Sequence, residues 1–261
     1  MKKNLLLLLL LFSVHIGINS STGFAQKVQF DSAGIKNLRS IPFLPDPLVL
    51  DEGRKNIPIV TPAQWKQKQD WIREQYQYCI SGSVPPAPKN FHVKVLQETV
   101  EDGIKLRTVE LSFGTDDKAK MTVELMIPTS QKRLPVFLTQ WNHRGWAQVA
   151  VRRGYIGCVY AGADMKDDTK NYSDVFPGYD FGTLMKRAWG GSRVIDYLYT
   201  LPQVDTARIA MTGHSRNGKQ SLMAAAFDNR IKAVISSSGG TGGESTFRWS
   251  DNRFTPGSFD R

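Results

Sequence analysis

The alternation of apolar and polar residues divides the first half of the chain into one helix and three strands. Thr61 and Pro62 start a run of helix-forming residues that continues to about Tyr78, and a Gly- and Pro-rich stretch, 82–88, ends it. From Phe91 onward apolar and polar residues alternate, which is the period of a strand with one buried face. The alternating segments are separated by short turns, so we expect antiparallel strands over 91–100, 104–113 and 121–127.

The second half of the chain shows a different pattern, in which continuous apolar runs alternate with segments of helical period. In the longest helical segment, apolar and small residues recur at spacings of three and four, which marks one face for packing against a sheet. Continuously apolar strands that alternate with helices are typical of a parallel sheet covered on both faces. We therefore expect an α/β domain with strands over 134–138, 155–160, 208–212 and 232–235 and helices over 146–153, 181–199 and 217–227.

The N-terminus has the features of a secretory signal peptide. Two lysines precede an unbroken apolar run over 5–12, and Gly23 and Ala25 place small residues before a cleavage point at Gln26. A membrane anchor is the alternative, but the apolar run is shorter than the ~20 residues of a spanning helix. We expect cleavage after Ala25, a periplasmic or secreted protein and no membrane association of the mature chain. The domain organisation is then a signal peptide (1–25), a Pro-rich arm (26–60) and an α/β domain (61–261).

Composition and charge narrow the classes of partner. The chain has 261 residues, 41% of them hydrophobic, with 6 Trp and 13 Phe, which excludes a disordered protein. The formal net charge is +10, and removal of residues 1–25, which contain two lysines and no acidic residue, leaves +8. A basic exported protein can bind nucleic acid, an anionic membrane surface or an acidic polysaccharide. Because the chain has no Lys/Arg-rich run and no zinc-finger spacing, we expect no nucleic-acid partner.

The two cysteines do not form a recognisable chemical motif. Cys79 and Cys158 are too few for a disulfide scaffold and lack the spacing of a zinc or redox site. Cys158 lies in an apolar strand segment and is expected to be a buried small side chain, although a disulfide with Cys79 stays open. We expect neither a metal site nor a cofactor.

The residues that suggest chemistry are concentrated in Gly-His-Ser-Arg-Asn-Gly-Lys, 213–219, between a predicted strand and a predicted helix. In one interpretation this segment is a nucleophile elbow, a sharp turn that exposes the hydroxyl of Ser215 at the carboxyl edge of the sheet. Backbone N–H groups at the start of the helix, beginning with Arg216, could then stabilise an oxyanion. The usual motif is G-x-S-x-G, and here the second glycine, Gly218, comes one position late.

A second interpretation of the same segment is a phosphate-binding P-loop. Gly213, Gly218 and Lys219 have the spacing of that motif, which also connects a strand to a helix. The P-loop lysine is followed by a Ser or Thr that binds magnesium, whereas this chain has Gln220. This difference and the signal peptide favour the elbow.

Three segments together resemble a known family. Residues 188–196, Ala-Trp-Gly-Gly-Ser-Arg-Val-Ile-Asp, are followed by the 213–219 segment and by Ser-Gly-Gly-Thr-Gly-Gly, 238–243. This order resembles the glucuronoyl esterases and the related bacterial acetyl-xylan-type esterases, from about residue 61 to the end. The resemblance implies an α/β-hydrolase fold with a Ser–acid–His triad. It also implies that Ser215 is the nucleophile, that Arg216 contributes to the oxyanion site and that Lys219 contacts substrate hydroxyls.

The remaining members of the triad are not evident in the sequence. Many members of the family have a glutamate in the loop after the strand that follows the elbow, where this chain has three serines, 236–238. Glu244 is a nearby candidate for the triad acid, but we assign it to substrate binding. The α/β-hydrolase order places the histidine after the serine, and no histidine follows Ser215. His143 lies where the fold builds the other half of its oxyanion hole and is expected to contact substrate.

Two explanations of the missing base remain. The chain is either the N-terminal part of a longer esterase or a catalytically silent glycan-binding protein with the same fold. We expect the first, because one predicted strand follows the elbow and the hydrolase fold carries its remaining catalytic groups on later strands. The sequence therefore predicts an exported serine esterase that cleaves glucuronoyl or acetyl esters of plant cell-wall polysaccharide through an acyl-enzyme. A P-loop nucleotide-binding protein is the remaining alternative.

Overall fold

The computed structural model describes residues 44–50 and 55–245. The predicted signal peptide and residues 26–43 and 51–54 of the predicted arm lie outside this part of the chain. The described part of the arm contains one antiparallel bridge, between Val49 and Pro58. None of the helices in the described ranges combines the length and apolarity needed to cross a membrane.

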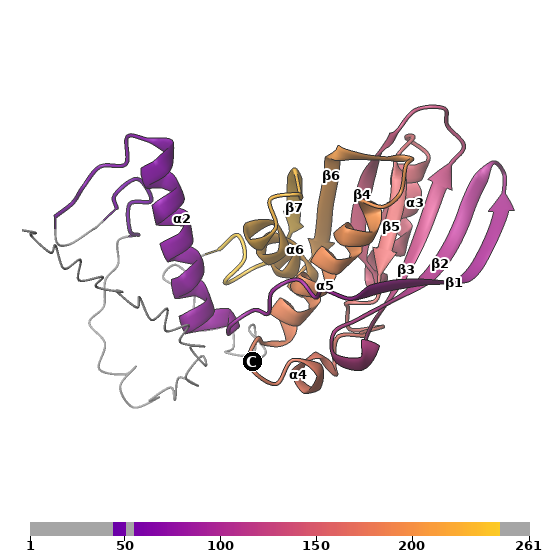
Figure 1. Ribbon diagram of the computed structural model, residues 1–261. Helices are drawn as coiled ribbons and strands as arrows, with labels where there is room; N and C mark the ends of the chain where they lie inside the picture. The colour runs from indigo at the N-terminus through magenta and orange to yellow at the C-terminus, as the bar shows by residue number, and fades with distance from the viewer. Residues whose placement is uncertain (1–43, 51–54, 246–261) are drawn as a thin grey trace, which may run out of the picture.

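The predicted first helix is present as α2 (Pro62–Tyr76) and continues as a π-helical turn (Gln77–Ser81). It begins with a reciprocal cap: the Gln64 amide donates to Thr61 Oγ1 (3.2 Å), and the Thr61 amide donates to Gln64 Oε1 (3.0 Å). Helix α2 lies beside the sheet rather than over it (Figure 1). It contacts the domain through Arg73, whose Nε donates to the carbonyl of Ala226 (2.8 Å).

The antiparallel strands are confirmed as β1 (Phe91–Glu101), β2 (Ile104–Phe113) and β3 (Ala119–Pro128). Asp102 and Gly103 connect β1 to β2, both with positive φ (49° and 73°). Paired positive φ values match the right-handed twist of a two-residue hairpin, and Asp-Gly is a preferred sequence for this turn. The alternation in the sequence therefore predicted both the strands and their connection.

The parallel strands are confirmed as β4 (Leu134–Gln140), β5 (Ile156–Tyr160), β6 (Val204–His214) and β7 (Ala233–Ser237). Together the described strands form a seven-stranded sheet in the order β1-β2-β3-β5-β4-β6-β7. The predicted helices are α3 (Arg144–Val151), α5 (Thr183–Leu198) and α6 (Arg216–Phe227). Three short elements were not predicted: the 3-10 turns Thr115–Asp117 and Trp141–His143, and α4 (Tyr172–Val175).

The strand order places helices on both faces of the sheet. The chain passes from β4 through α3 to β5 on one side of β4, and from β5 through α5 to β6 on the other side. Because such crossovers are right-handed, α3 and α5 cover opposite faces, and α6 packs beside α5. The domain is therefore an α/β fold of the α/β-hydrolase type, as the sequence predicted.

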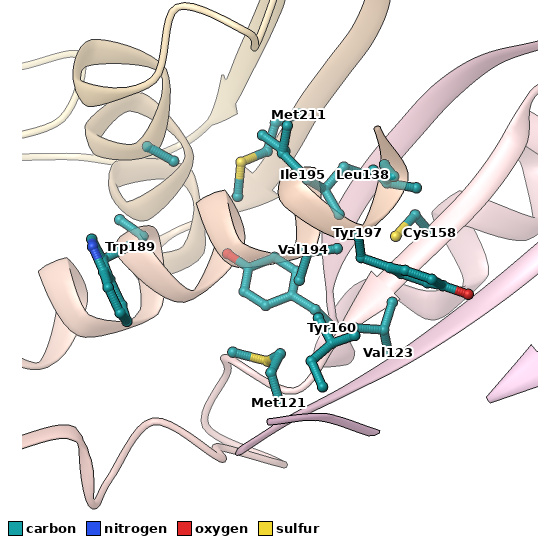
Figure 2. Packing of buried hydrophobic residues seen from close by; sticks show 14 of the residues in the cluster. Met121, Val123, Leu138, Cys158, Tyr160, Trp189, Val194, Ile195, Tyr197 and Met211 are labelled. Atoms are coloured by element: carbon teal, nitrogen blue, oxygen red, sulfur yellow. The ribbon is translucent and has the colours of Figure 1, made fainter. Parts of the chain in front are cut away.

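Two clusters of buried hydrophobic residues lie on the two faces of the sheet. In β5, Cys158 and Tyr160 point toward Val194 and Ile195 of α5, within the larger cluster (Figure 2). The intervening Val159 belongs to a smaller cluster with Ala147 and Val151 of α3. A strand that is apolar on both faces needs this double cover, which explains why 155–160 reads as a continuous apolar run.

Both cysteines are free, which closes the possibility of a disulfide between them. Cys158 is fully buried, as predicted, and burial raises the pKa of its thiol. Cys79 is exposed on the π-helical turn.

Candidate active site

The segment 213–219 forms a sharp turn from the end of β6 into the first turn of α6. Ser215 sits at this turn with φ 56° and ψ −126°, a conformation that a residue with a side chain rarely adopts. Its backbone is held from both sides: the Ser215 amide donates to the carbonyl of Ser237 in β7 (2.8 Å), and the Ser215 carbonyl accepts from Gly218 (2.9 Å). A strained, exposed serine fixed by its neighbours is the geometry of a nucleophile elbow.

The two glycines of the motif are required by close approach. A Cβ at Gly213 would lie 2.3 Å from the carbonyl oxygen of Asn217 and 2.5 Å from Gln140 Oε1. A Cβ at Gly218 would lie 2.6 Å from Ser236 Oγ, because α6 passes close to β7 at this point.

The late second glycine has the same explanation. Position 217 is occupied by a buried asparagine, which faces His143, with its Nδ2 3.1 Å from His143 Nε2. The residue that approaches β7 closely, and therefore has to be a glycine, is the next one, Gly218. The sequence G-x-S-x-x-G therefore builds the elbow in this chain.

His143 supports the elbow from the loop that follows β4. Its Nε2 accepts a hydrogen bond from the His214 amide (3.2 Å) and faces Asn217 Nδ2 (3.1 Å), and its ring stacks on Trp146 with a centroid distance of 4.5 Å. Burial, and to a lesser extent the neighbouring His214, lower the pKa of His143. This network assigns a neutral imidazole with its proton on Nδ1. Nε2 is thus engaged by the protein, and only Nδ1 is left for a substrate contact of the kind expected from the sequence.

Arg216 is held at the site by a chain of ion pairs that sequence reasoning did not identify. Its Nη2 lies 2.6 Å from Asp164 Oδ2, and Asp164 Oδ1 lies 2.9 Å from Nη1 of Arg187 in α5. The buried Arg187 in turn contacts Asp167 through Nε (2.7 Å). Both aspartates follow β5, and the ends of neighbouring parallel strands meet at one edge of a sheet. Their position shortly after the predicted strand 155–160 was the feature of the sequence that could have identified these two aspartates as site residues.

Lys219 and Glu244 lie on different parts of this edge. Lys219 is 5% exposed in α6, so it is not an ordinary solvated lysine. Glu244 is exposed in the loop after β7, and the Ser236 hydroxyl and the backbone amides of Gly239 and Gly240 lower its pKa to about 2. Ser236 Oγ makes no hydrogen bond of normal geometry, but it lies close to the Glu244 carboxylate beside Gly239. Glu244 is therefore an ionised carboxylate bound to its own loop.

Within the described residues, no histidine donates to or accepts from the hydroxyl of Ser215. His143 is engaged by the elbow backbone, and Nδ1 of His214 lies 3.2 Å from Ser237 Oγ. His92 lies in β1, beside Asp117. The sequence has four histidines, and the fourth, His15, belongs to the predicted signal peptide. Residues 44–50 and 55–245 thus offer a positioned serine but no histidine bonded to it.

The geometry also bears on the P-loop interpretation. A P-loop binds phosphate with free backbone amides. Here the amide of Ser215 donates to Ser237, and the amides of Gly218 and Lys219 donate to the Ser215 carbonyl. These groups form the turn itself and are not available to an anion, so the arrangement favours acyl transfer over nucleotide binding.

Comparison with known proteins gives consistent matches. A family model described as "Glucuronyl esterase, fungi" matches residues 111–259. The 4-O-methyl-glucuronoyl methylesterase 1 of Wolfiporia cocos (strain MD-104) is 28% identical over 225 residues, covering 79% of this chain and 52% of the relative. Carbohydrate esterase MZ0003, from an unknown prokaryotic organism, is 26% identical over 264 residues, covering 78% of this chain and 60% of the relative. The chain thus spans little more than half the length of these curated relatives.

Solved structures agree on the fold. The glucuronoyl esterase from Solibacter usitatus superposes with a TM-score of 0.66 at 23% identity, covering 80% of this chain and 67% of that structure. At this level of identity the similarity establishes the architecture, and the chemistry is argued from the site.

Proposed function

The chain belongs to the glucuronoyl esterase family, and from this premise we propose that its protein is a serine esterase that cleaves glucuronoyl esters carried by a polysaccharide. The observation that carries the proposal is Ser215 at the strained turn between β6 and α6, with its backbone bonded to β7 and to the first turn of α6. The matched relatives named as 4-O-methyl-glucuronoyl methylesterases suggest the substrate class.

The proposed reaction is acyl transfer through the serine. Ser215 Oγ attacks the ester carbonyl while a base accepts its proton, and the collapse of the tetrahedral intermediate releases the alcohol, which takes up that proton. Water then attacks the acyl-enzyme, frees the uronic acid and returns the proton to Ser215. Since none of the histidines in the described part of the chain is bonded to Ser215, and the sequence has no histidine after His214, the proposal takes the base, and with it the triad acid, from residues outside this sequence.

The other site residues have supporting roles in this proposal. The Arg216 guanidinium, oriented by Asp164, stabilises the negative charge that develops on the carbonyl oxygen. Lys219 and Glu244 offer charged groups to substrate hydroxyls, and His143 offers Nδ1–H. The net charge of +8 after removal of residues 1–25 suits an acidic polysaccharide, and the leader pattern of those residues supports export.

The test is hydrolysis of a methyl glucuronate ester by the protein expressed from its complete reading frame. Ser215→Ala is expected to lower kcat by roughly 10⁶, as removal of an activated nucleophile does. Ser173→Ala is the matched control, since Ser173 is an exposed serine of α4, and it is expected to retain full activity.

Activity that survives Ser215→Ala would refute the serine mechanism. An acetyl ester tested alongside separates substrate class from mechanism. Ser215-dependent cleavage of the acetyl ester without cleavage of the glucuronate ester would keep the mechanism and replace the proposed substrate.

A further inference from the structure

Asn217 is the extra residue of this elbow, which the usual motif G-x-S-x-G lacks. It is 5% exposed in the first turn of α6, and its carbonyl accepts from the Ser221 hydroxyl (2.9 Å), which fixes its backbone. Among the described residues its side chain contacts His143, with Nδ2 3.1 Å from Nε2, while Oδ1 has no hydrogen-bond partner. A buried amide with an unpaired oxygen costs stability, so the contact with His143 is the feature that needs an explanation.

Two N–H groups converge on the same ring nitrogen of His143. The backbone amide of His214 donates to Nε2 (3.2 Å), and Nδ2 of Asn217 faces the same atom. A backbone amide can only donate, so Nε2 accepts and carries no proton. The Asn217 oxygen in place of Nδ2 would meet only a lone pair, which assigns the NH2 group to this position. The imidazole is therefore neutral and keeps one N–H, on Nδ1.

The surroundings of the ring also favour the neutral form. The ring stacks on Trp146, with centroids 4.5 Å apart and an angle of 17° between the planes, and it meets the ring of His214 edge-on at 6.4 Å. Burial, and then the neighbouring His214 of β6, lower the pKa of His143, and no carboxylate of the described residues contributes to this shift. The histidine of a catalytic triad has the opposite arrangement, with a carboxylate at one ring nitrogen and the nucleophile at the other.

The acidic residues on neighbouring elements are held by arginines. Glu124 Oε2 of β3 accepts from Nε of Arg144, the residue after His143 (2.6 Å). Asp164 Oδ2, in the loop after β5, accepts from Nη2 of Arg216 (2.6 Å). These two carboxylates are therefore engaged elsewhere and do not orient the imidazole as a base.

We propose that Asn217 is a positioning residue that holds the His143 imidazole neutral, with its proton on Nδ1, so that His143 serves the site as a hydrogen-bond donor and not as a base. The His214 amide selects Nε2 as the acceptor, and Asn217 adds a second donor that opposes protonation there. The use of Nδ1–H by a substrate rests on the proposed esterase function, whereas the protonation state of His143 does not.

The test is ¹⁵N NMR of the histidine side chains in the protein expressed from its complete reading frame, with His143→Gln used to assign the His143 signals. The unmodified protein is expected to show a neutral His143 with its proton on Nδ1 at about pH 7.5. Asn217→Ala removes the second donor and should raise the pKa of His143, while the His214 amide keeps the proton on Nδ1. Asn217→Asp replaces the donor with a charged acceptor of nearly the same shape. It should move the proton to Nε2 and raise the proton affinity of His143 by about tenfold or more.

Asn229→Asp is the matched control. It adds the same charge at an exposed asparagine beyond the other end of α6, where Oδ1 already accepts from Nη2 of Arg73 (3.3 Å). It should leave the tautomer and the pKa of His143 unchanged.

Hydrolysis of the methyl glucuronate ester separates this proposal from the proposed function. In Asn217→Asp, kcat/KM relative to the unmodified protein should fall about tenfold at about pH 9, where the neutral ring has no Nδ1–H, which is the value of one hydrogen bond to substrate. The deficit should shrink at lower pH, where the imidazolium regains Nδ1–H. An inactive unmodified protein would refute the proposed function and leave the NMR result to decide this one. The proposal is overturned if His143 of the unmodified protein carries its proton on Nε2 or is a cation at about pH 7.5, or if both Asn217 variants keep its pKa and tautomer.

Discussion

Replacement of Gly213 by alanine tests the elbow geometry with a single methyl group. The added Cβ would lie 2.3 Å from the Asn217 carbonyl oxygen, 2.5 Å from the Asn217 carbonyl carbon and 2.5 Å from Gln140 Oε1. Two of these atoms are backbone of the first turn of α6 and cannot move without the helix. The third belongs to a side chain whose Nε2 donates to Ser221 Oγ (2.9 Å) and which is therefore also fixed.

The magnitude follows from two opposing effects. Overpacking a well-packed site costs about 1–3 kcal/mol, and contact with fixed backbone places this site at the upper end of that range. Alanine also restricts the unfolded chain, which returns about 0.4–1 kcal/mol. We therefore expect Gly213→Ala to lower the free energy of unfolding by about 2–2.6 kcal/mol.

The assay is equilibrium unfolding in urea followed by tryptophan fluorescence. Gly178→Ala is the matched control, because Gly178 has no positive φ and a Cβ there meets nothing within 4 Å. The control is expected to be unchanged or more stable by up to about 1 kcal/mol. Hydrogen exchange at the Gly218 amide, which bonds to the Ser215 carbonyl, should accelerate in Gly213→Ala and not in the control. A loss below about 1 kcal/mol with normal exchange would refute the close packing of the elbow.

Three further predictions address the site. Arg216→Lys in the active protein should lower kcat more than it raises KM, because lysine keeps the charge but loses the planar fork that Asp164 orients; an unchanged kcat would assign Arg216 a structural role. The 261-residue chain alone should hydrolyse a methyl glucuronate ester no faster than its Ser215→Ala variant, because no histidine that the structure describes is bonded to Ser215; a rate above that control would contradict this assignment. Because the pKa of His143 is lowered in the folded protein, the unfolded chain binds more protons at this residue once the pH falls below about 6.5. The contribution of His143 to stability is therefore complete above that pH and is lost as the pH falls toward the folded-state pKa. Urea unfolding at pH 7.5 and 5.5 should show a smaller pH dependence in His143→Gln than in the unmodified chain, and an equal dependence would place the effect elsewhere.

The local pattern of the sequence was sufficient for the long helices and the strands, and it favoured the elbow over the P-loop. The alternation from Phe91, the Asp-Gly turn and the apolar run 155–160 each specify a conformation through neighbours within a few residues. The same holds for a serine between a strand and a helix with a glycine two residues before it. These features depend on short-range sterics and on burial of one or both faces, which periodicity records directly.

Contacts between residues far apart in the sequence could be identified only from the tertiary structure. The ion pair between Asp164 and Arg216 joins residues far apart in the chain, and it exists because β5 and β6 flank β4 and end at the same edge of the sheet. The late glycine became intelligible only when His143, from the loop after β4, was seen to contact Asn217. Arg193 of α5 lines a cavity whose walls also come from α6 and from the segment between α2 and β1, so the sequence of the helix alone gives no sign of it. Periodicity reports which face of an element is buried, whereas the partner that covers that face is set by strand order and crossover hand, which act over separations that no local pattern encodes.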